Sequence, residues 1–155
     1  MTHRREVEAI LAGARAERAA LHDQLSPGLR AALPVDATGI TQAIDHLGEA
    51  AGLDLHREQA QGHKTNSAVL HGRVFGCAPL SRDTVLAAFV DGARVRAETL
   101  AHLAEAVGGD ALADEVRASL ERHPPAATEP ELRAAYAAQE DAALRIAVHL
   151  DEQSR

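Results

Sequence analysis

The chain has 155 residues and a formal net charge of −7 at pH 7, with 23 acidic side chains against 16 Lys and Arg. This balance argues against nucleic acid as a partner, because binding the phosphate backbone requires clustered cations. Apolar residues make up 46% of the sequence but aromatic residues only 2%, so Ala, Leu, Val and Ile must fill the core. Because Ala is the strongest helix former and strand-favouring residues are sparse, we expect an all-α fold.

Length and cysteine content bound the organisation further. A chain of this size predicts a single domain over residues 1–155 with one hydrophobic core. The lone Cys77 excludes an intrachain disulfide and is typical of a reducing compartment. The run from Thr2 to Glu8 is polar and no long apolar stretch follows it, so we expect no signal peptide, no membrane span and a cytoplasmic location.

The first predicted helix covers Thr2 to Leu25, where apolar residues recur at helical spacing until Ser26-Pro27-Gly28 ends the pattern. Arg18 falls near the middle of the apolar face, so we expect its guanidinium either to reach solvent along its aliphatic stem or to contact a ligand. The apolar positions of this helix are Val7, Ile10, Leu11, Ala14, Leu21 and Leu25.

Two further helices are expected before the centre of the chain. A short one passes through Leu29 and Leu33 and ends at Pro34, because the residue before a proline is pushed out of helical geometry. The next begins with Asp36 or Thr38 as its N-cap, and Gly52 lies just past its end as a C-terminal signal. Its apolar positions are Ile40, Ala43, Ile44, Leu47 and Ala51.

The centre of the chain is the least regular part. From Leu55 to Ser67 the sequence is polar with no periodic apolar face, which predicts the longest connection. The stretch 68–77 can form a buried short helix or a strand, because short apolar runs do not resolve by period. We favour a helix, since a lone strand has no partner in an otherwise helical chain.

The same central segment gathers His56, His63, His71 and Cys77. Imidazole and thiolate groups together suit zinc or copper, and a cysteine beside a histidine can also be a nucleophile pair. Their spacing matches no compact metal signature, so a chance cluster with Cys77 as a small buried hydrophobe is the simpler interpretation. The alternative that we keep is a site for zinc, copper or iron formed by His63, His71 and Cys77.

A long helix is predicted from Ser81 to Val107, ended by a tight turn at Gly108-Gly109. Asp110 then caps a shorter helix, which the prolines at 124 and 125 stop. The apolar stripe of the long helix contains Leu86, Phe89, Val90, Ala93, Ala97, Leu100, Ala104 and Val107.

A polar stripe on the same long helix has the residue types of a metal site. Asp91, Glu98, His102 and Glu105 recur at spacings that place them on one face. At about 100° per residue this face lies about 120 to 180° from the apolar stripe, which indicates a solvated surface. The sequence also lacks the inward Glu-x-x-His pairs of ferritin-like bundles, His-Glu-x-x-His, Cys-x-x-Cys, a phosphate-binding glycine loop and a Gly-x-Ser-x-Gly elbow.

The last predicted helix starts at a capping box formed by Thr128 and Glu131. Gln139 falls in the middle of its apolar stripe, and a buried amide costs about 1 to 3 kcal/mol unless it is hydrogen-bonded. A backbone group or water can satisfy it, or it can line a ligand pocket between the first and last helices. The stripe contains Leu132, Ala135, Tyr136, Ala143, Ile146 and Leu150.

Together these elements predict an up-and-down-like helical bundle of four main helices plus two or three short ones. The leading functional hypothesis is a non-enzymatic binding module without a cofactor, which holds a small molecule or a protein partner through Arg18, Gln139 and Tyr136. The alternative is a metal-binding protein or metal-dependent enzyme that uses the central His/Cys segment. Because alanine-rich helices bury little area each, we also expect a homodimer.

Overall fold

The computed structural model describes residues 2–24, 37–55 and 82–154, and every regular element in these ranges is a helix. The all-α prediction is thus confirmed for the described chain. None of these helices combines the length and the apolar character that a membrane crossing requires. The predicted short helix at 29–33 and the segments 56–67 and 68–77 lie outside the described residues. The helices are α1 (His3–Gln24), α3 (Thr38–Ala50), α5 (Arg82–Glu121) and α6 (Glu129–Gln153).

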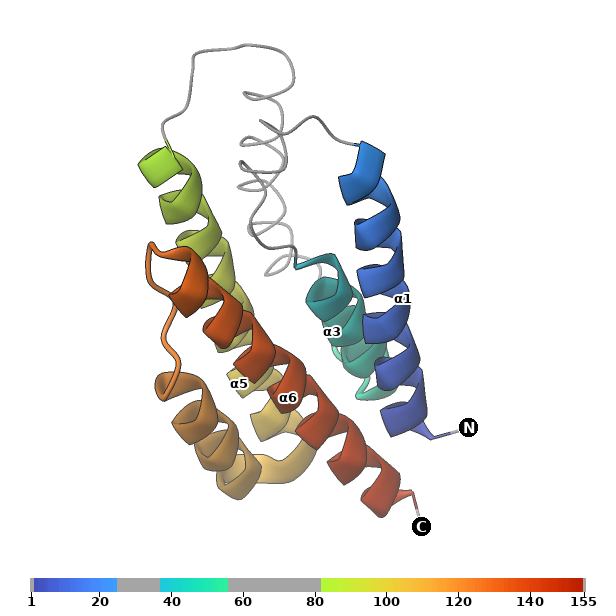
Figure 1. The fold of residues 1–155 in the computed structure, drawn as a ribbon. Coiled ribbons are helices and arrows are strands. Elements are labelled where there is room, and N and C mark those ends of the chain that lie inside the picture. Colours follow the sequence, from blue (N-terminus) through green and yellow to red (C-terminus); the bar gives the residue numbers. More distant parts are fainter. Residues whose placement is uncertain (1, 25–36, 56–81, 155) are drawn as a thin grey trace.

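The helices pack lengthwise, as Figure 1 shows. His46 of α3 contacts His3 of α1, whereas Gly39 lies against Ala14, so α1 and α3 run antiparallel. Helix α6 is likewise antiparallel to α1, because Asp151 bonds to the first turn of α1 and Arg15 pairs with Glu140. Both ends of the described chain therefore lie at the same end of the molecule.

A close approach between α1 and α3 depends on Gly39. A Cβ atom at this position would lie 2.9 Å from the Cβ atom of Ala14 and 3.4 Å from a methyl carbon of Leu11. Real Cβ atoms do not tolerate the first of these distances, so only glycine allows the two backbones to pack this closely. This contact sets the spacing of the two helices whose other ends carry His3 and His46.

Helix α5 consists of two segments that meet at Gly109. This residue has φ 69° and ψ −162°, a conformation that is essentially restricted to glycine. The predicted end of the long helix at Gly108-Gly109 is therefore confirmed. Gln153 donates a hydrogen bond to the carbonyl oxygen of Val107 on the first segment, and Arg145 bonds to Glu115 on the second segment.

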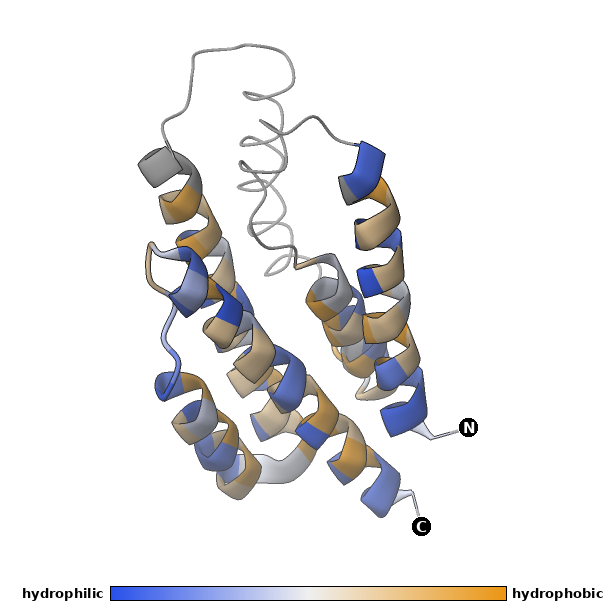
Figure 2. Ribbon diagram, in the orientation of Figure 1, coloured by the Kyte–Doolittle hydropathy of each residue, from blue (hydrophilic) through white to orange (hydrophobic). Residues whose placement is uncertain are grey.

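The core consists mainly of the apolar faces predicted for these helices, and Leu103 of α5 is buried in addition to the predicted stripe. In Figure 2 the hydrophobic colour lies mainly on the sides where helices face one another, and the hydrophilic colour lies mainly outside. Most of the large aliphatic side chains are buried with many alanines between them, which is the composition that the sequence predicts. The largest fully buried apolar side chains are Val7, Ile40, Ile44, Leu47, Leu100, Leu103, Val116, Leu132 and Ile146.

Local signals were correct at some helix ends and wrong at others. Thr128 caps α6 and accepts a hydrogen bond from the backbone N–H of Glu131, and Gly52 adopts a positive φ of 73° just after α3. The predicted cap of α3 was wrong, because Ala37 occupies the N-cap position without a side-chain bond.

Leu21 was wrongly assigned to the core, since it is 60% exposed. Helix α3 begins beside Ala14 and does not extend along α1 to Leu21.

Candidate metal centre

Three side chains converge where α1 begins and α3 nears its end. The Nδ1 atom of His3 lies 3.1 Å from Nε2 of His46, and the same Nε2 lies 2.9 Å from Oε2 of Glu6. One nitrogen or oxygen from each residue falls within 4.8 Å of the other two. Within 2–24, 37–55 and 82–154, these three residues form the one such group of potential metal ligands, which we name the His-Glu-His cluster.

The helical repeat and the antiparallel packing bring the cluster together. His3 and Glu6 are three positions apart, so they project from the same face of α1. Val7, next to Glu6, is fully buried and holds this turn against the core. On α3, Leu47 is fully buried while its neighbour His46 is half-buried at the edge of the helix contact. The cluster therefore lies at the rim of the α1/α3 interface.

Hydrogen bonds among the three side chains do not satisfy all three ligand atoms at once. An imidazole Nε2 either carries a proton and donates, or has a lone pair and accepts. If His46 Nε2 donates, its single N–H is shared between Glu6 and His3. If it accepts from His3, it faces the carboxylate oxygen of Glu6 at 2.9 Å without a proton between them. A cation between the three atoms removes this conflict, since each atom then binds it with a lone pair.

Two of the three separations between ligand atoms fit a transition-metal ion. Two ligand atoms that bind one ion at about 2.0 to 2.2 Å, at angles of about 90 to 110°, lie roughly 3 to 3.5 Å apart. The two short separations in the cluster, 3.1 and 2.9 Å, are close to this range. Two imidazoles and one carboxylate form a donor set used by catalytic zinc sites and by non-haem iron(II) sites.

Solvent reaches the cluster. The side chains of His46 and Glu6 are 24% and 35% exposed, and His3 is half-buried. A cavity of about 650 Å³ borders His3 and is also lined by Arg4, Arg5 and Asp151. An ion can therefore enter from water without a rearrangement of the core.

Helix α6 holds the first turn of α1 from the other side. The carboxylate of Asp151 accepts hydrogen bonds from the backbone N–H groups of His3, at 2.7 Å, and Arg4, at 3.0 Å. His3 is thus in contact with α3 through its side chain and with α6 through its backbone. A carboxylate at a helix N-terminus also offsets the partial positive charge there.

Two of the residues predicted to bind a ligand, Tyr136 and Gln139, face α5. Gln139 is buried as expected, and its Nε2 donates to the carbonyl oxygen of Ala93 at 2.8 Å. Its Oε1 atom is buried with no hydrogen-bond partner among the described atoms. The hydroxyl of Tyr136 accepts a hydrogen bond of 2.8 Å from Arg96. Both contacts join α6 to α5.

The third predicted ligand residue, Arg18, lies elsewhere. It is half-buried on α1 and lines a cavity of about 220 Å³ between α1, α3 and α6. Arg15 and Glu140, which form an ion pair, line the same cavity, whereas Tyr136 and Gln139 do not. The structure thus places a cavity beside Arg18 but does not bring all three predicted residues to it.

Sequence reasoning missed a buried arginine. Arg96 is 3% exposed, and its guanidinium carbon lies 5.1 Å from the centre of the Tyr136 ring. The signal was present, because Arg96 stands three residues after Ala93 and four before Leu100 on the apolar stripe of α5. Gly92 provides the room for this side chain, since a Cβ there would lie 3.3 Å from the guanidinium.

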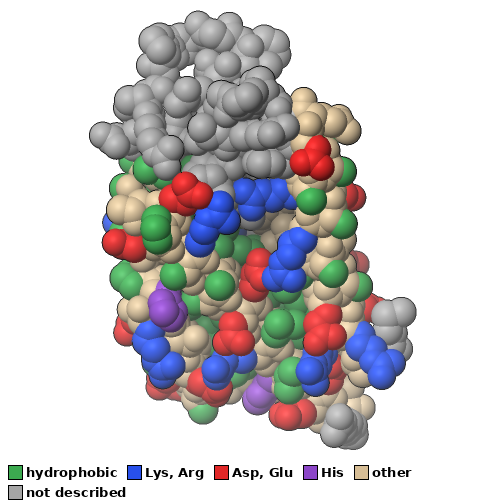
Figure 3. Space-filling view, in the orientation of Figure 1, with side chains coloured by type: hydrophobic (Ala, Val, Ile, Leu, Met, Phe, Trp, Pro, Cys, Tyr) green, Lys and Arg blue, Asp and Glu red, His purple; other side chains and the backbone are tan. Residues whose placement is uncertain are grey.

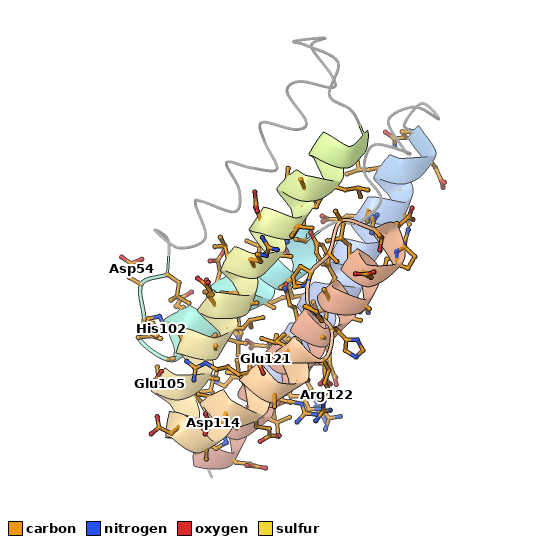
Figure 4. All side chains as sticks on the ribbon, turned by 90° about the vertical axis from the view of Figure 1, so that its left-hand side faces the viewer. Asp54, His102, Glu105, Asp114, Glu121 and Arg122 are labelled. Atoms are coloured by element: carbon orange, nitrogen blue, oxygen red, sulfur yellow. The ribbon has the colours of Figure 1, made fainter. Side chains whose placement is uncertain are left out.

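The His-Glu-His cluster was also missed, although His3-x-x-Glu6 is a helical ligand spacing that could have been recognised. The three residues proposed from the sequence as a metal site, His63, His71 and Cys77, lie outside the described residues. The polar stripe on α5 is exposed, as predicted. His102 and Glu105 of this stripe lie at the outer edge of the molecule in Figure 4.

Charges of both signs are interspersed over the face shown in Figure 3, with no broad area of one sign. Arg145 illustrates the pattern, since it bonds to Asp141 on its own helix and to Glu115 on α5. The hydrogen bond to Asp141, and then that to Glu115, raise the pKa of this guanidinium despite the opposing effect of partial burial. It therefore stays charged and links α6 to the second segment of α5.

No protein-family model matches the chain, and no curated protein or solved structure matches it either. The function is therefore argued from the geometry of the site.

Proposed function

We propose that this protein is a helical bundle that binds one divalent transition-metal ion, of the zinc class, through His3, Glu6 and His46. The observation that carries the proposal is the grouping of three ligand atoms within 4.8 Å of one another, with Nε2 of His46 3.1 Å from Nδ1 of His3 and 2.9 Å from Oε2 of Glu6. The donor set, the distances and the solvent access all suit such an ion.

The ion would link α1 to α3 at the rim of their interface. Only Val7 and Leu11 of α1 are buried among its described side chains, so the apolar attachment of this helix is limited. Two imidazoles and a carboxylate from two helices provide an additional connection that depends on the metal. Metal binding should therefore raise the stability of the folded protein, because the ion binds the folded form and not the separated ligands.

The test is a Zn²⁺ titration of the full chain, freed of metal with a chelator, in competition with a chromophoric indicator. We expect one equivalent to bind, and His46→Ala to weaken the affinity by more than about 100-fold, because loss of an outer-shell partner alone costs 10- to 100-fold. His3→Ala and Glu6→Gln should also weaken the Zn²⁺ affinity.

The matched control is His123→Ala, which removes an exposed histidine just after the end of α5 and should leave the affinity unchanged. Full Zn²⁺ affinity in His46→Ala contradicts the proposal. So does its loss in His71→Ala or Cys77→Ala with the cluster intact, because that result assigns the ion to the central segment.

A further inference from the structure

In the N-terminal turn of α1, two backbone N–H groups are capped by a residue of the last helix, α6. The backbone N–H groups before the first intrahelical bond of a helix need partners outside the helix. In α1 that first bond runs from the Glu6 N–H to the carbonyl oxygen of Thr2 at 3.1 Å. The N–H of Arg5 bonds to the Thr2 hydroxyl at 3.2 Å. The N–H groups of His3 and Arg4 bond instead to the two carboxylate oxygens of Asp151.

These two bonds bear directly on the position of the His3 imidazole. His3 is the first residue of α1, and terminal turns fray unless they are held. Glu6 lies one turn further in, beside the fully buried Val7, and His46 lies within α3. The imidazole of His3 is thus the ligand of the cluster with the least local support, and Asp151 holds the backbone from which it projects.

The charge of Asp151 also favours a bound cation near His3. The N-terminus of a helix carries a partial positive charge of about half a unit, which disfavours a cation nearby. The carboxylate of Asp151 lies on this terminus, 2.7 Å from the nitrogen of His3, and offsets that charge. His46 lies near the C-terminal end of α3, where the helix dipole favours a cation.

We infer that Asp151 is the positioning residue of the metal centre, which holds the first turn of α1 so that His3 binds the ion together with Glu6 and His46. This inference rests on the proposed function. It makes the C-terminal helix α6 part of the site although α6 supplies none of the three ligands, and it predicts that metal affinity depends on a residue that does not touch the metal.

The experiment measures Zn²⁺ affinity by indicator competition in full-length Asp151→Ala and Asp151→Asn. We expect Asp151→Ala to bind Zn²⁺ about 10- to 100-fold more weakly than the unmodified protein, which is the range for the loss of an outer-shell partner. Asp151→Asn keeps one carbonyl acceptor for the two N–H groups, so it should recover part of the affinity. Circular dichroism at the titration temperature verifies that each variant is folded.

The matched control is the neighbouring carboxylate Glu152. It is exposed and, like Asp151, lines the cavity of about 650 Å³ beside His3. Glu152→Ala and Glu152→Gln remove the same charge without removing a bond to α1, so they should change the affinity less than about twofold. A decrease as large in Glu152→Ala as in Asp151→Ala would show that only net charge matters and would overturn the inference.

A further variant separates positioning from general stability. In a His3→Ala background, Asp151→Ala should cause a much smaller further loss of Zn²⁺ affinity, because the positioning acts through His3 and only the effect of the charge is left. An additional loss of tenfold or more there overturns the inference. If the unmodified protein binds no Zn²⁺, the proposed function itself fails. If it binds Zn²⁺ and Asp151→Ala binds equally well, only the role of Asp151 fails.

Discussion

The hydroxyl of Tyr136 on α6 accepts a hydrogen bond of 2.8 Å from the guanidinium of Arg96 on α5, and both side chains are at least 95% buried. A buried cation is expensive unless polar groups surround it. The ring of Tyr136, 5.1 Å from the guanidinium carbon, adds a cation–π contact to the hydrogen bond. This pair therefore joins the two helices with the most extensive mutual packing.

Tyr136→Phe keeps the ring and removes the acceptor from Arg96. We expect the free energy of unfolding to fall by about 1 to 3 kcal/mol, the range for a lost bond to a buried charged group. Urea unfolding followed by circular dichroism measures it. A double-mutant cycle with Arg96→Met should give a coupling energy of about 1 kcal/mol or more between the two side chains. Strict additivity of the two substitutions would contradict the hydrogen bond.

Gln139 makes one hydrogen bond in the core and leaves a second polar atom without a partner. Its Nε2 donates to the carbonyl oxygen of Ala93, while Oε1 is buried and unpaired among the described atoms. A made bond contributes about 0.5 to 1.5 kcal/mol, whereas an unsatisfied buried acceptor costs about 1 to 3 kcal/mol. Gln139→Met, which keeps the shape, should therefore raise the free energy of unfolding by about 1 kcal/mol.

The control for this substitution is Gln139→Glu, which has the same shape but buries a carboxylate and loses the donor. It should destabilise the protein in the same urea experiment. A decrease in stability of more than about 1 kcal/mol in Gln139→Met would mean that the bond to Ala93 outweighs the unpaired oxygen.

The turn inside α5 supplies a test of the backbone. Gly109→Ala places a side chain at φ 69° and ψ −162°, which should cost about 1 to 3 kcal/mol. Gly13→Ala is the matched control, because Gly13 is an exposed helical residue and a Cβ added there would meet no atom within 4 Å. It should stabilise the protein by about 0.5 to 1 kcal/mol. Equal effects of the two substitutions in thermal unfolding would contradict the account of the turn.

The helices and most of their buried faces could be predicted because they depend on local periodicity. The stripe of α5 and the N-cap at Thr128 are of this kind, and so is the break at Gly109. The predicted burial of Leu21 was wrong, because it depends on how far α3 extends along α1, and no local pattern determines that. Self-association into a homodimer stays a prediction.

The site could be predicted only in part, because it is assembled across helices. The spacing of His3 and Glu6 is local, but their meeting with His46 depends on the antiparallel packing of α1 and α3. The contribution of Asp151 depends on the meeting of the two chain ends. Arg96 could have been recognised from its position between Ala93 and Leu100, whereas its partner Tyr136 comes from another helix.

The coordination shell of the bound ion tests the central claim most directly, and X-ray absorption spectroscopy of the protein loaded with one equivalent of Zn²⁺ measures it. The His-Glu-His cluster predicts a shell of nitrogen and oxygen atoms at about 2.0 to 2.1 Å, with the signature of two imidazoles and no sulfur. His46→Ala should remove one imidazole from this shell. A sulfur atom at about 2.3 Å would place the ion at Cys77 and contradict the account.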